Sequence, residues 1–131
     1  MISTRLAGGV LEAPDGSFVL AEWTDEGESS RDAPVAPLHA HLDEDEAWYV
    51  LEGRLGFRVG DEEVIAEPGD AVFVRRGMPH TYWNAGSGPA RYLLVMGPQT
   101  YRLIEAIHAA ANRDLQTMQE LFREHGSELL A

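Results

Sequence analysis

Four side chains in this sequence are of the types that bind divalent metal ions: His39, His41, Glu46 and His80. His39 and His41 are separated by one residue, so in a strand both side chains point to the same face. Glu46 follows the acidic run 43–45, which is predicted to be a solvated turn. Three imidazoles and one carboxylate suit a borderline divalent ion with a net charge of about +1 and, at six-fold coordination, about two open positions. Such a site polarises an oxygen atom, activates water or binds an enolate.

The segments that must bring these side chains together have the pattern of short β-strands. Turn-forming residues rich in Gly, Pro and Asp separate apolar segments up to residue 97. Strands are predicted at 10–11, 18–21, 38–42, 46–51, 55–59, 64–66, 71–74, 80–83 and 91–96, and the polar stretch 24–37 is predicted to be a mobile loop. Many short strands at even spacing are typical of a sandwich or barrel, and a barrel brings distant strands together around one interior.

The last part of the chain has helical periodicity instead. Apolar residues recur at helical spacing over 100–111 and again over 115–122. Asn112 or Asp114 is a suitable N-cap for the second helix, and Gly126 is a suitable stop. We therefore expect a single domain over 1–131, with a barrel over about 5–97 and a helical tail over about 100–126.

Composition narrows the class of protein. The chain of 131 residues has a formal net charge of −12 and no cysteine. This charge repels phosphate backbones and anionic lipids, and no apolar run approaches the ~20 residues that span a bilayer, so we expect neither nucleic acid nor membrane as a partner. Without cysteine there is no disulfide, thiolate metal site or cysteine nucleophile. The N-terminal residues lack a signal-peptide pattern, and a cytoplasmic location is expected.

The spacing of the four side chains resembles that of the cupin family. The stretch His39-Ala40-His41, followed by Glu46 and Gly53, is similar to the first cupin motif. The stretch Gly69-Asp70, followed by Gly77, His80 and Asn84, is similar to the second. Two positions depart from the pattern: Ala33 stands where a glycine is usual, and Arg75 where a proline is usual. Neither position is a ligand, so the departures leave the metal set intact.

The resemblance implies an all-β fold, a cupin jelly-roll β-barrel with a short C-terminal helical tail. It also implies one divalent transition metal ion per chain (Fe, Ni, Mn, Co, Cu or Zn) on His39, His41, Glu46 and His80. The family includes dioxygenases, isomerases, decarboxylases, cyclases, sensors and storage proteins, so the fold leaves the reaction open. A single barrel with a helical tail is most similar to the quercetinase-like bacterial monocupins.

The leading functional hypothesis is a metal-dependent dioxygenase, an oxidoreductase that acts on a small aromatic or enolisable substrate. In this hypothesis Glu46 is also the catalytic residue that takes the substrate proton. One alternative is a non-redox cyclase or isomerase that uses the ion as a Lewis acid. A second alternative is a barrel that binds a small ligand without catalysis.

Strand alternation indicates which side chains face the site. Trp48 and Tyr82 share the parity of the ligands, so we expect them to line the cavity and stack on a flat substrate. Phe57 and Met78 are further candidates for substrate contacts. Trp48 is equally compatible with a place in the barrel core.

Two predicted strands are apolar on both faces, namely 71–74 and 91–96. A barrel interior takes only one face of each strand. The other face needs cover from the tail helices or from a second subunit. From this we expect a homodimer.

Overall fold

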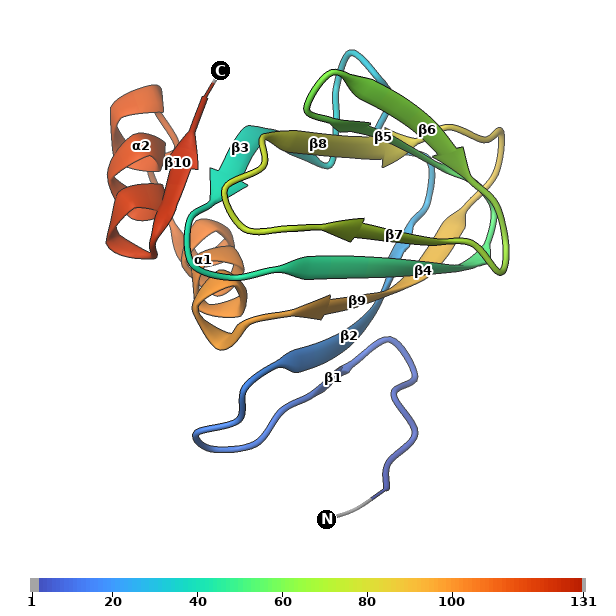
Figure 1. Ribbon diagram of the computed structural model, residues 1–131, viewed down its shortest axis with the longest axis horizontal. Helices are drawn as coiled ribbons and strands as arrows, with labels where there is room; N and C mark the ends of the chain where they lie inside the picture. Colours follow the sequence, from blue (N-terminus) through green and yellow to red (C-terminus); the bar gives the residue numbers. More distant parts are fainter. Residues whose placement is uncertain (1–2, 131) are drawn as a thin grey trace.

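The computed structural model describes residues 3–130 and contains two five-stranded sheets that enclose a common core (Figure 1). The strand order is β1-β2-β9-β4-β7 in one sheet and β10-β3-β8-β5-β6 in the other, and the pairings are antiparallel. The elements are β1 (Val10–Leu11), β2 (Val19–Asp25), β3 (Ala36–His41), β4 (Glu46–Glu52), β5 (Leu55–Val59), β6 (Glu62–Ala66), β7 (Ala71–Val74), β8 (His80–Asn84), β9 (Ala90–Met96), α1 (Pro98–Ala109), α2 (Leu115–Glu124) and β10 (Ser127–Leu129). The expected all-β fold with a helical tail is confirmed.

The core lies between the inner faces of the two sheets, because buried and exposed positions alternate along the strands. In β4 the inward positions include Trp48 and Val50, each 1% exposed, whereas Tyr49 between them is 44% exposed. Leu55 and Phe57 of β5 pack into the same cluster from the opposite sheet. The alternation therefore decides which residues of each strand point into the interior.

The glycine of the first motif has a local structural reason. Gly53 lies between β4 and β5, where the chain passes from one sheet to the other. Its φ is +76°, and a Cβ at this position would lie 2.3 Å from the carbonyl oxygen of Pro89. Only glycine combines a left-handed backbone with so close an approach.

Most element boundaries agree with the sequence prediction within a few residues, but two segments differ. The stretch 24–37, predicted to be a loop, contains the end of β2 and the start of β3, because backbone pairing with β9 continues through the polar residues Thr24 and Asp25. Strand β10 was not predicted, since three residues are too few for a visible alternation and the strand forms only beside β3. Asp114 caps α2 by accepting the backbone N–H of Thr117 at 2.8 Å. Within residues 3–130 neither helix is long and apolar enough to cross a bilayer.

The acidic run after β3 is only in part the solvated turn that was predicted, since Asp43 is exposed but Glu44 and Asp45 are hydrogen bonded to distant backbone groups. The carboxylate of Glu44 accepts the backbone N–H groups of Gln99 and Thr100, at 3.1 and 2.7 Å. These are free donors at the N-terminus of α1, where a negative charge also favours the helix dipole. Asp45 accepts the backbone N–H of Arg76 at 2.8 Å. Glu44 thus holds the start of α1 against the barrel, and Asp45 holds the segment before β8. The sequence alone does not reveal these contacts, because their partners lie far along the chain.

Candidate functional site

The four candidate ligands come from three strands in two sheets. His39 of β3 is the register partner of His80 of β8, and His41 lies two residues further along β3. Glu46 is the first residue of β4, in the opposite sheet. Each of the four is at most 5% exposed. The barrel therefore buries, at one place, four polar side chains that lie far apart in the sequence.

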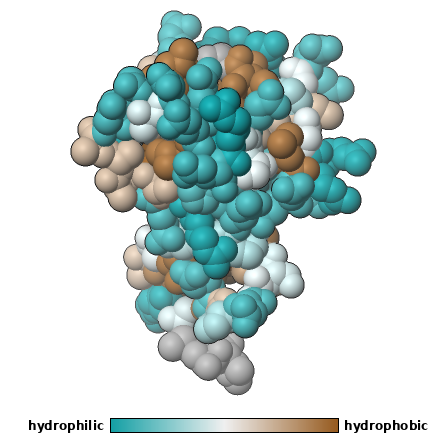
Figure 2. Space-filling view, turned by 90° about the vertical axis from the view of Figure 1, so that its left-hand side faces the viewer, coloured by the Kyte–Doolittle hydropathy of each residue, from teal (hydrophilic) through white to brown (hydrophobic). Residues whose placement is uncertain are grey.

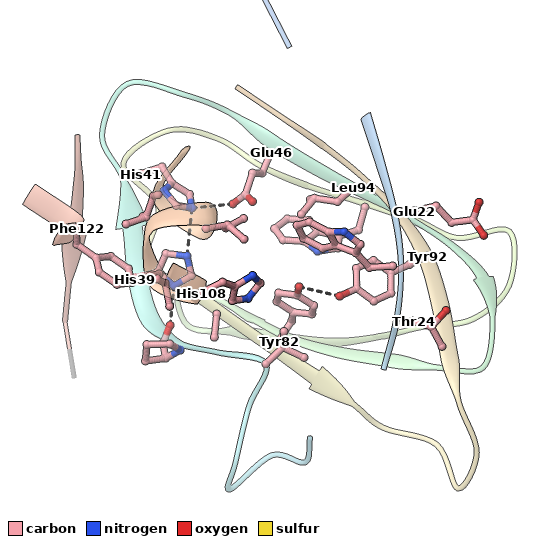
Figure 3. Close-up of a pocket in the computed structure, with 18 of the residues that line it drawn as sticks. Glu22, Thr24, His39, His41, Glu46, Tyr82, Tyr92, Leu94, His108 and Phe122 are labelled. Carbon is pink, nitrogen blue, oxygen red and sulfur yellow. Dashed lines mark hydrogen bonds and ion pairs between the residues drawn. The ribbon is translucent and has the colours of Figure 1, made fainter. Parts of the chain in front are cut away.

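The donor atoms of the four side chains converge, and Figure 3 shows three of them, His39, His41 and Glu46. One ligand atom from each of the four residues lies within 4.8 Å of the others. Oε1 of Glu46 is 3.0 Å from Nε2 of His41 and also 3.0 Å from Nε2 of His80. Nε2 of His39 is 3.2 Å from Nε2 of His41. All three imidazoles thus present the same ring nitrogen to a common point.

In His39 and His80 the other ring nitrogen, Nδ1, is hydrogen bonded to a backbone carbonyl oxygen. Nδ1 of His39 donates to the carbonyl oxygen of Pro37 at 2.6 Å, and Nδ1 of His80 donates to that of Met78 at 2.9 Å. A carbonyl oxygen only accepts, so in both rings Nδ1 carries the hydrogen. Partners of this kind fix the ring orientation of metal-binding histidines.

Burial and neighbouring charges determine the protonation of the cluster. Burial, together with the nearby His80 and His41, lowers the pKa of His39 to about 3, so this ring is neutral at pH 7. Burial alone would raise the pKa of Glu46, but the close approach of its carboxylate to the rings of His41 and His80 outweighs burial and brings the pKa to about 2. The cluster therefore contains a neutral imidazole and a carboxylate in a buried setting.

This donor set fits a divalent cation. The neutral His39 ring, with its hydrogen on Nδ1, directs the lone pair of Nε2 toward the common point. The Glu46 carboxylate directs negative oxygen to the same place. Electron-pair donors this close together in a buried site are stable when a cation lies among them, and nitrogen and oxygen donors in this proportion suit a borderline metal ion.

A cavity of about 490 Å³ adjoins the cluster and has α1 as one wall (Figure 3). The segment before β1 contributes Gly8, and the C-terminal helices contribute Leu103, Ile104, Ile107, His108 and Phe122. The strands and the segment before β3 contribute Glu22, Trp23, Thr24, Val35, Ala36, Pro37, His39, His41, Glu46, Trp48, Tyr82, Tyr92 and Leu94. Among the residues that the structure describes, no lysine or arginine lines this cavity. The walls are mainly apolar and aromatic, and the ligand cluster is the main polar feature.

The structure brings two of the four predicted substrate-binding residues to the cavity. Trp48 and Tyr82 line it, with ring centroids 5.3 Å apart. Trp48 also belongs to the core cluster, so its two expected roles coincide. Phe57 stacks on Tyr82 from the core side and does not line the cavity, and Met78 does not line it either. Strand alternation predicts which residues point into the barrel, but it does not predict how close each of them lies to the cavity.

Sequence reasoning missed the C-terminal contribution to the site. Phe122 of α2 lies edge-on to His39, with ring centroids 5.7 Å apart, and His108 of α1 is a cavity residue. Ser127 of β10 is hydrogen bonded to His41. The apolar stripes of the two helices predicted that they pack against the barrel, but only the fold shows that they lie beside the ligand cluster. For Ser127 the sequence has no signal.

The chain resembles known proteins in both sequence and fold. A 60-residue segment is 42% identical to the tetracenomycin polyketide synthase protein TcmJ of Streptomyces glaucescens, over 46% of this chain and 40% of that protein. The chain spans less than half the length of the curated relatives it matches. A sugar phosphate isomerase from Silicibacter pomeroyi DSS-3, described as a cupin, has a TM-score of 0.54 at 26% identity, over 63% of this chain and 51% of that one.

The fold itself is matched over a larger share of the chain. A cupin protein from Bacteroides fragilis superposes with a TM-score of 0.59 over 90% of this chain and 92% of its own, at 12% identity. The family model for the cupin domain matches residues 30–96, which include all four candidate ligands. From this match, and from the two facing sheets around a buried His/Glu cluster, we conclude that the chain belongs to the cupin family.

Proposed function

We propose that this chain is a metal-dependent enzyme that acts on a small, flat phenol or enolisable compound, as a quercetinase-like dioxygenase. The observation that carries the proposal is the buried cluster of His39, His41, Glu46 and His80 beside a cavity with aromatic walls. A divalent ion held by these residues supplies a Lewis acid that favours the deprotonated form of a phenol or enol. The cavity residues then decide which compound reaches it.

The charge of the cavity favours a substrate without phosphate. No lysine or arginine lines the described cavity, and the carboxylate of Glu46 does, whereas that of Glu22 turns away from the cavity to pair with Arg91. Phosphate and phosphonate groups are usually bound by arginine, lysine or free backbone N–H groups. The rings of Trp48 and Tyr82 instead suit a flat apolar body. We therefore place the substrate among aromatic and polyketide-like compounds and not among sugar phosphates.

Two side chains have specific roles in this proposal. Glu46 is the carboxylate that lines the cavity, and we assign it the proton that the phenol or enol gives up. Nε1 of Trp48 is buried near the hydroxyl of Tyr82 and makes no well-formed hydrogen bond among the described residues. A buried donor without a good partner costs free energy, which a substrate oxygen within reach relieves. We therefore favour a substrate with a second oxygen that accepts from Trp48.

A second candidate function is a cyclase or isomerase that consumes no O₂. It is favoured by the similarity to TcmJ, which is named as a polyketide synthase protein. Polyketide chains enolise readily, so the same cavity and the same carboxylate serve proton transfer without oxidation. The two candidates share the site and differ only in the requirement for O₂.

The metal site is tested by elemental analysis of the purified protein and of a His39→Ala/His41→Ala double variant. We expect about one ion per chain in the wild type and none in the variant, because half of the donor set is lost. Addition of metal at about 100 times its Kd stabilises the wild type by about 2.7 kcal/mol. Equal metal content in both proteins, or a wild type that binds no ion, contradicts the assignment.

The reaction is tested on protein loaded in turn with Fe, Ni, Co, Mn and Zn. Flavonols, diketones and polyketide-like phenols are offered, and oxygen uptake and product mass are recorded. Oxygen uptake that is lost in Glu46→Gln and kept in the neighbouring control Asp43→Asn supports the dioxygenase. Conversion without O₂ supports the cyclase or isomerase. Tight binding with no turnover under any metal contradicts both and leaves a ligand-binding barrel.

We also propose that two chains associate through the outer face of the β1-β2-β9-β4-β7 sheet. Tyr49, Phe73 and Val95 are 44%, 65% and 38% exposed, and Phe73 and Val95 are both register partners of Ala47. The C-terminal helices lie at the end of the barrel and leave this face open (Figure 1). That helical end is mostly hydrophilic, with small separate apolar patches (Figure 2). A contiguous apolar face of this kind packs against the same face of a second chain across a two-fold axis.

A further inference from the structure

Two of the three site histidines are oriented by their own strands. In both, Nδ1 bonds the carbonyl oxygen two residues earlier, that of Pro37 for His39 and that of Met78 for His80. His41 departs from this local rule. Its Nδ1 lies 2.7 Å from Oγ of Ser127, which follows 86 positions later in the chain. One ligand thus depends on a distant segment that the other two do not need.

Ser127 is placed at His41 by backbone pairing. Strand β10 adds to the edge of β3 in an antiparallel register that sets Ser127 opposite His41 and Leu129 opposite His39. Ser127 is 2% exposed, so water does not compete for its hydroxyl. The hydroxyl oxygen is also 3.4 Å from the carbonyl oxygen of His125, to which it donates its single hydrogen. Its lone pairs are then free to accept from Nδ1 of His41.

We propose that Ser127 is a positioning residue of the metal site, which orients the His41 ring and keeps its hydrogen on Nδ1 so that Nε2 faces the ion. The segment 115–129 is thereby part of the metal-binding unit, although the cupin-domain match ends at residue 96. This inference rests on the proposed metal site. It goes beyond it by assigning a partner for His41 outside the matched region.

The hydroxyl oxygen of Ser127 acts on His41 as the two backbone carbonyl oxygens act on the other rings. Because its hydrogen is donated to the carbonyl oxygen of His125, the oxygen accepts from Nδ1 of His41 and holds the hydrogen there, as the carbonyl oxygens of Pro37 and Met78 do for His39 and His80. Loss of the hydroxyl leaves a buried ring nitrogen without a partner, which is costly and loosens the ring.

The first test compares the affinity for Zn²⁺, measured by competition with a chromophoric chelator, in Ser127→Ala, Ser127→Thr and the wild type. Removal of such a supporting partner weakens metal binding about 10- to 100-fold, and we expect this for Ser127→Ala. Ser127→Thr keeps the hydroxyl and the wild-type affinity. The matched control is Ser29→Ala, whose Oγ accepts the backbone N–H of Asn84 on β8 at 2.9 Å and touches no ligand. Equal affinities for Ser127→Ala and Ser29→Ala overturn the proposal.

The second test is spectroscopic and needs no activity. In the zinc-loaded, ¹⁵N-labelled protein, the His41 Nδ1–H signal exchanges slowly with water in the wild type and in Ser127→Thr, and fast in Ser127→Ala. A wild-type signal that exchanges as fast as the ring N–H of the exposed His108 overturns the proposal without any variant.

The third test separates this inference from the metal site itself. In the metal-free protein, the His41 ring nitrogen shifts change in Ser127→Ala and not in Ser29→Ala. This result supports the role of Ser127 even where no metal loads and the proposed function fails. Unchanged shifts in both variants overturn it.

Discussion

The two faces of the β1-β2-β9-β4-β7 sheet are both apolar, yet they have different roles. The inner face carries Glu46 and Trp48 on β4, which are 5% and 1% exposed. The outer face carries Tyr49 on the same strand and Phe73 on β7, which are 44% and 65% exposed. Neighbouring residues of β4 therefore have opposite environments: Glu46 and Trp48 face the cavity, and Tyr49 lies on the exposed surface.

The hydrophobicity of a strand therefore does not by itself identify the residues of the core. Alternation assigns alternate residues to opposite faces but does not say which face the second sheet covers. In this chain the second sheet and the C-terminal helices close the inner side, and the outer side lacks cover within residues 3–130. The following predictions test how far the two faces differ.

The largest expected effect is on Trp48. Trp48→Ala removes a side chain that is 1% exposed and packs on Phe57 and Tyr82, so it should lower the free energy of unfolding by about 3–5 kcal/mol. Tyr49→Ala, on the outer face of the same strand, should cost about 1 kcal/mol or less within one chain. Chemical denaturation measures both, and repetition over a range of protein concentrations separates folding from association. Equal costs would mean that the two faces are equally buried.

The next prediction concerns association. Phe73→Glu places a charge at the centre of the outer apolar face and should weaken a dimer by about 2 kcal/mol or more, because a desolvated charge replaces an aromatic contact. Light scattering should show a dimeric wild type and a monomeric variant with unchanged far-UV circular dichroism. The control is Ile65→Glu, since Ile65 is also exposed, at 47%, but lies on β6 of the other sheet. A monomeric wild type at micromolar concentration contradicts the homodimer.

A smaller effect is expected at alkaline pH on the inner face. Burial raises the pKa of Tyr92 to about 12, and its hydroxyl lies 2.9 Å from that of Tyr82. The unfolded phenol has a pKa of about 10, so the folded state binds this proton more tightly. The resulting stability is complete below about pH 10 and is lost as the pH rises through about 12. Denaturation curves between these values should fall less steeply with pH in Tyr92→Phe than in the wild type, and parallel curves would contradict the prediction.

The smallest effect is expected for an ion pair on the outer face. Arg91 lies 3.1 Å from Glu22 and 3.6 Å from Glu52, with 40% of its side chain exposed. Exposed pairs contribute about 0.2–1 kcal/mol and are screened by salt. Arg91→Ala should therefore change the unfolding free energy by no more than this in dilute buffer, and by less in high salt. A loss as large as that for Trp48→Ala would show that the outer face is buried in the folded state.

Much of the fold and of the site was predictable, because the strand and helix patterns agreed with the spacing of the two cupin motifs. The strands 55–59 and 71–74 were predicted with their observed bounds, and the two helices within a few residues. The four candidate ligands were identified from spacing, and the fold brings them within 4.8 Å of one another. What failed depends on tertiary contacts. Glu44 became the cap of α1 because the fold brings that helix to it.

The strand alternation, the helical tail and the ligand types could be predicted without a structure, as could the residues that share the ligands' side of each strand, because all of these follow from side-chain chemistry and from spacing along the chain. The packing of the sheets and helices places Phe57 and Met78 outside the cavity and makes α1 one of its walls. It also decided that Ser127 meets His41, because β10 forms only where β3 offers an open edge. A hydrogen bond between residues 86 positions apart depends on which strands pair in the folded chain, and no local sequence pattern predicts that pairing.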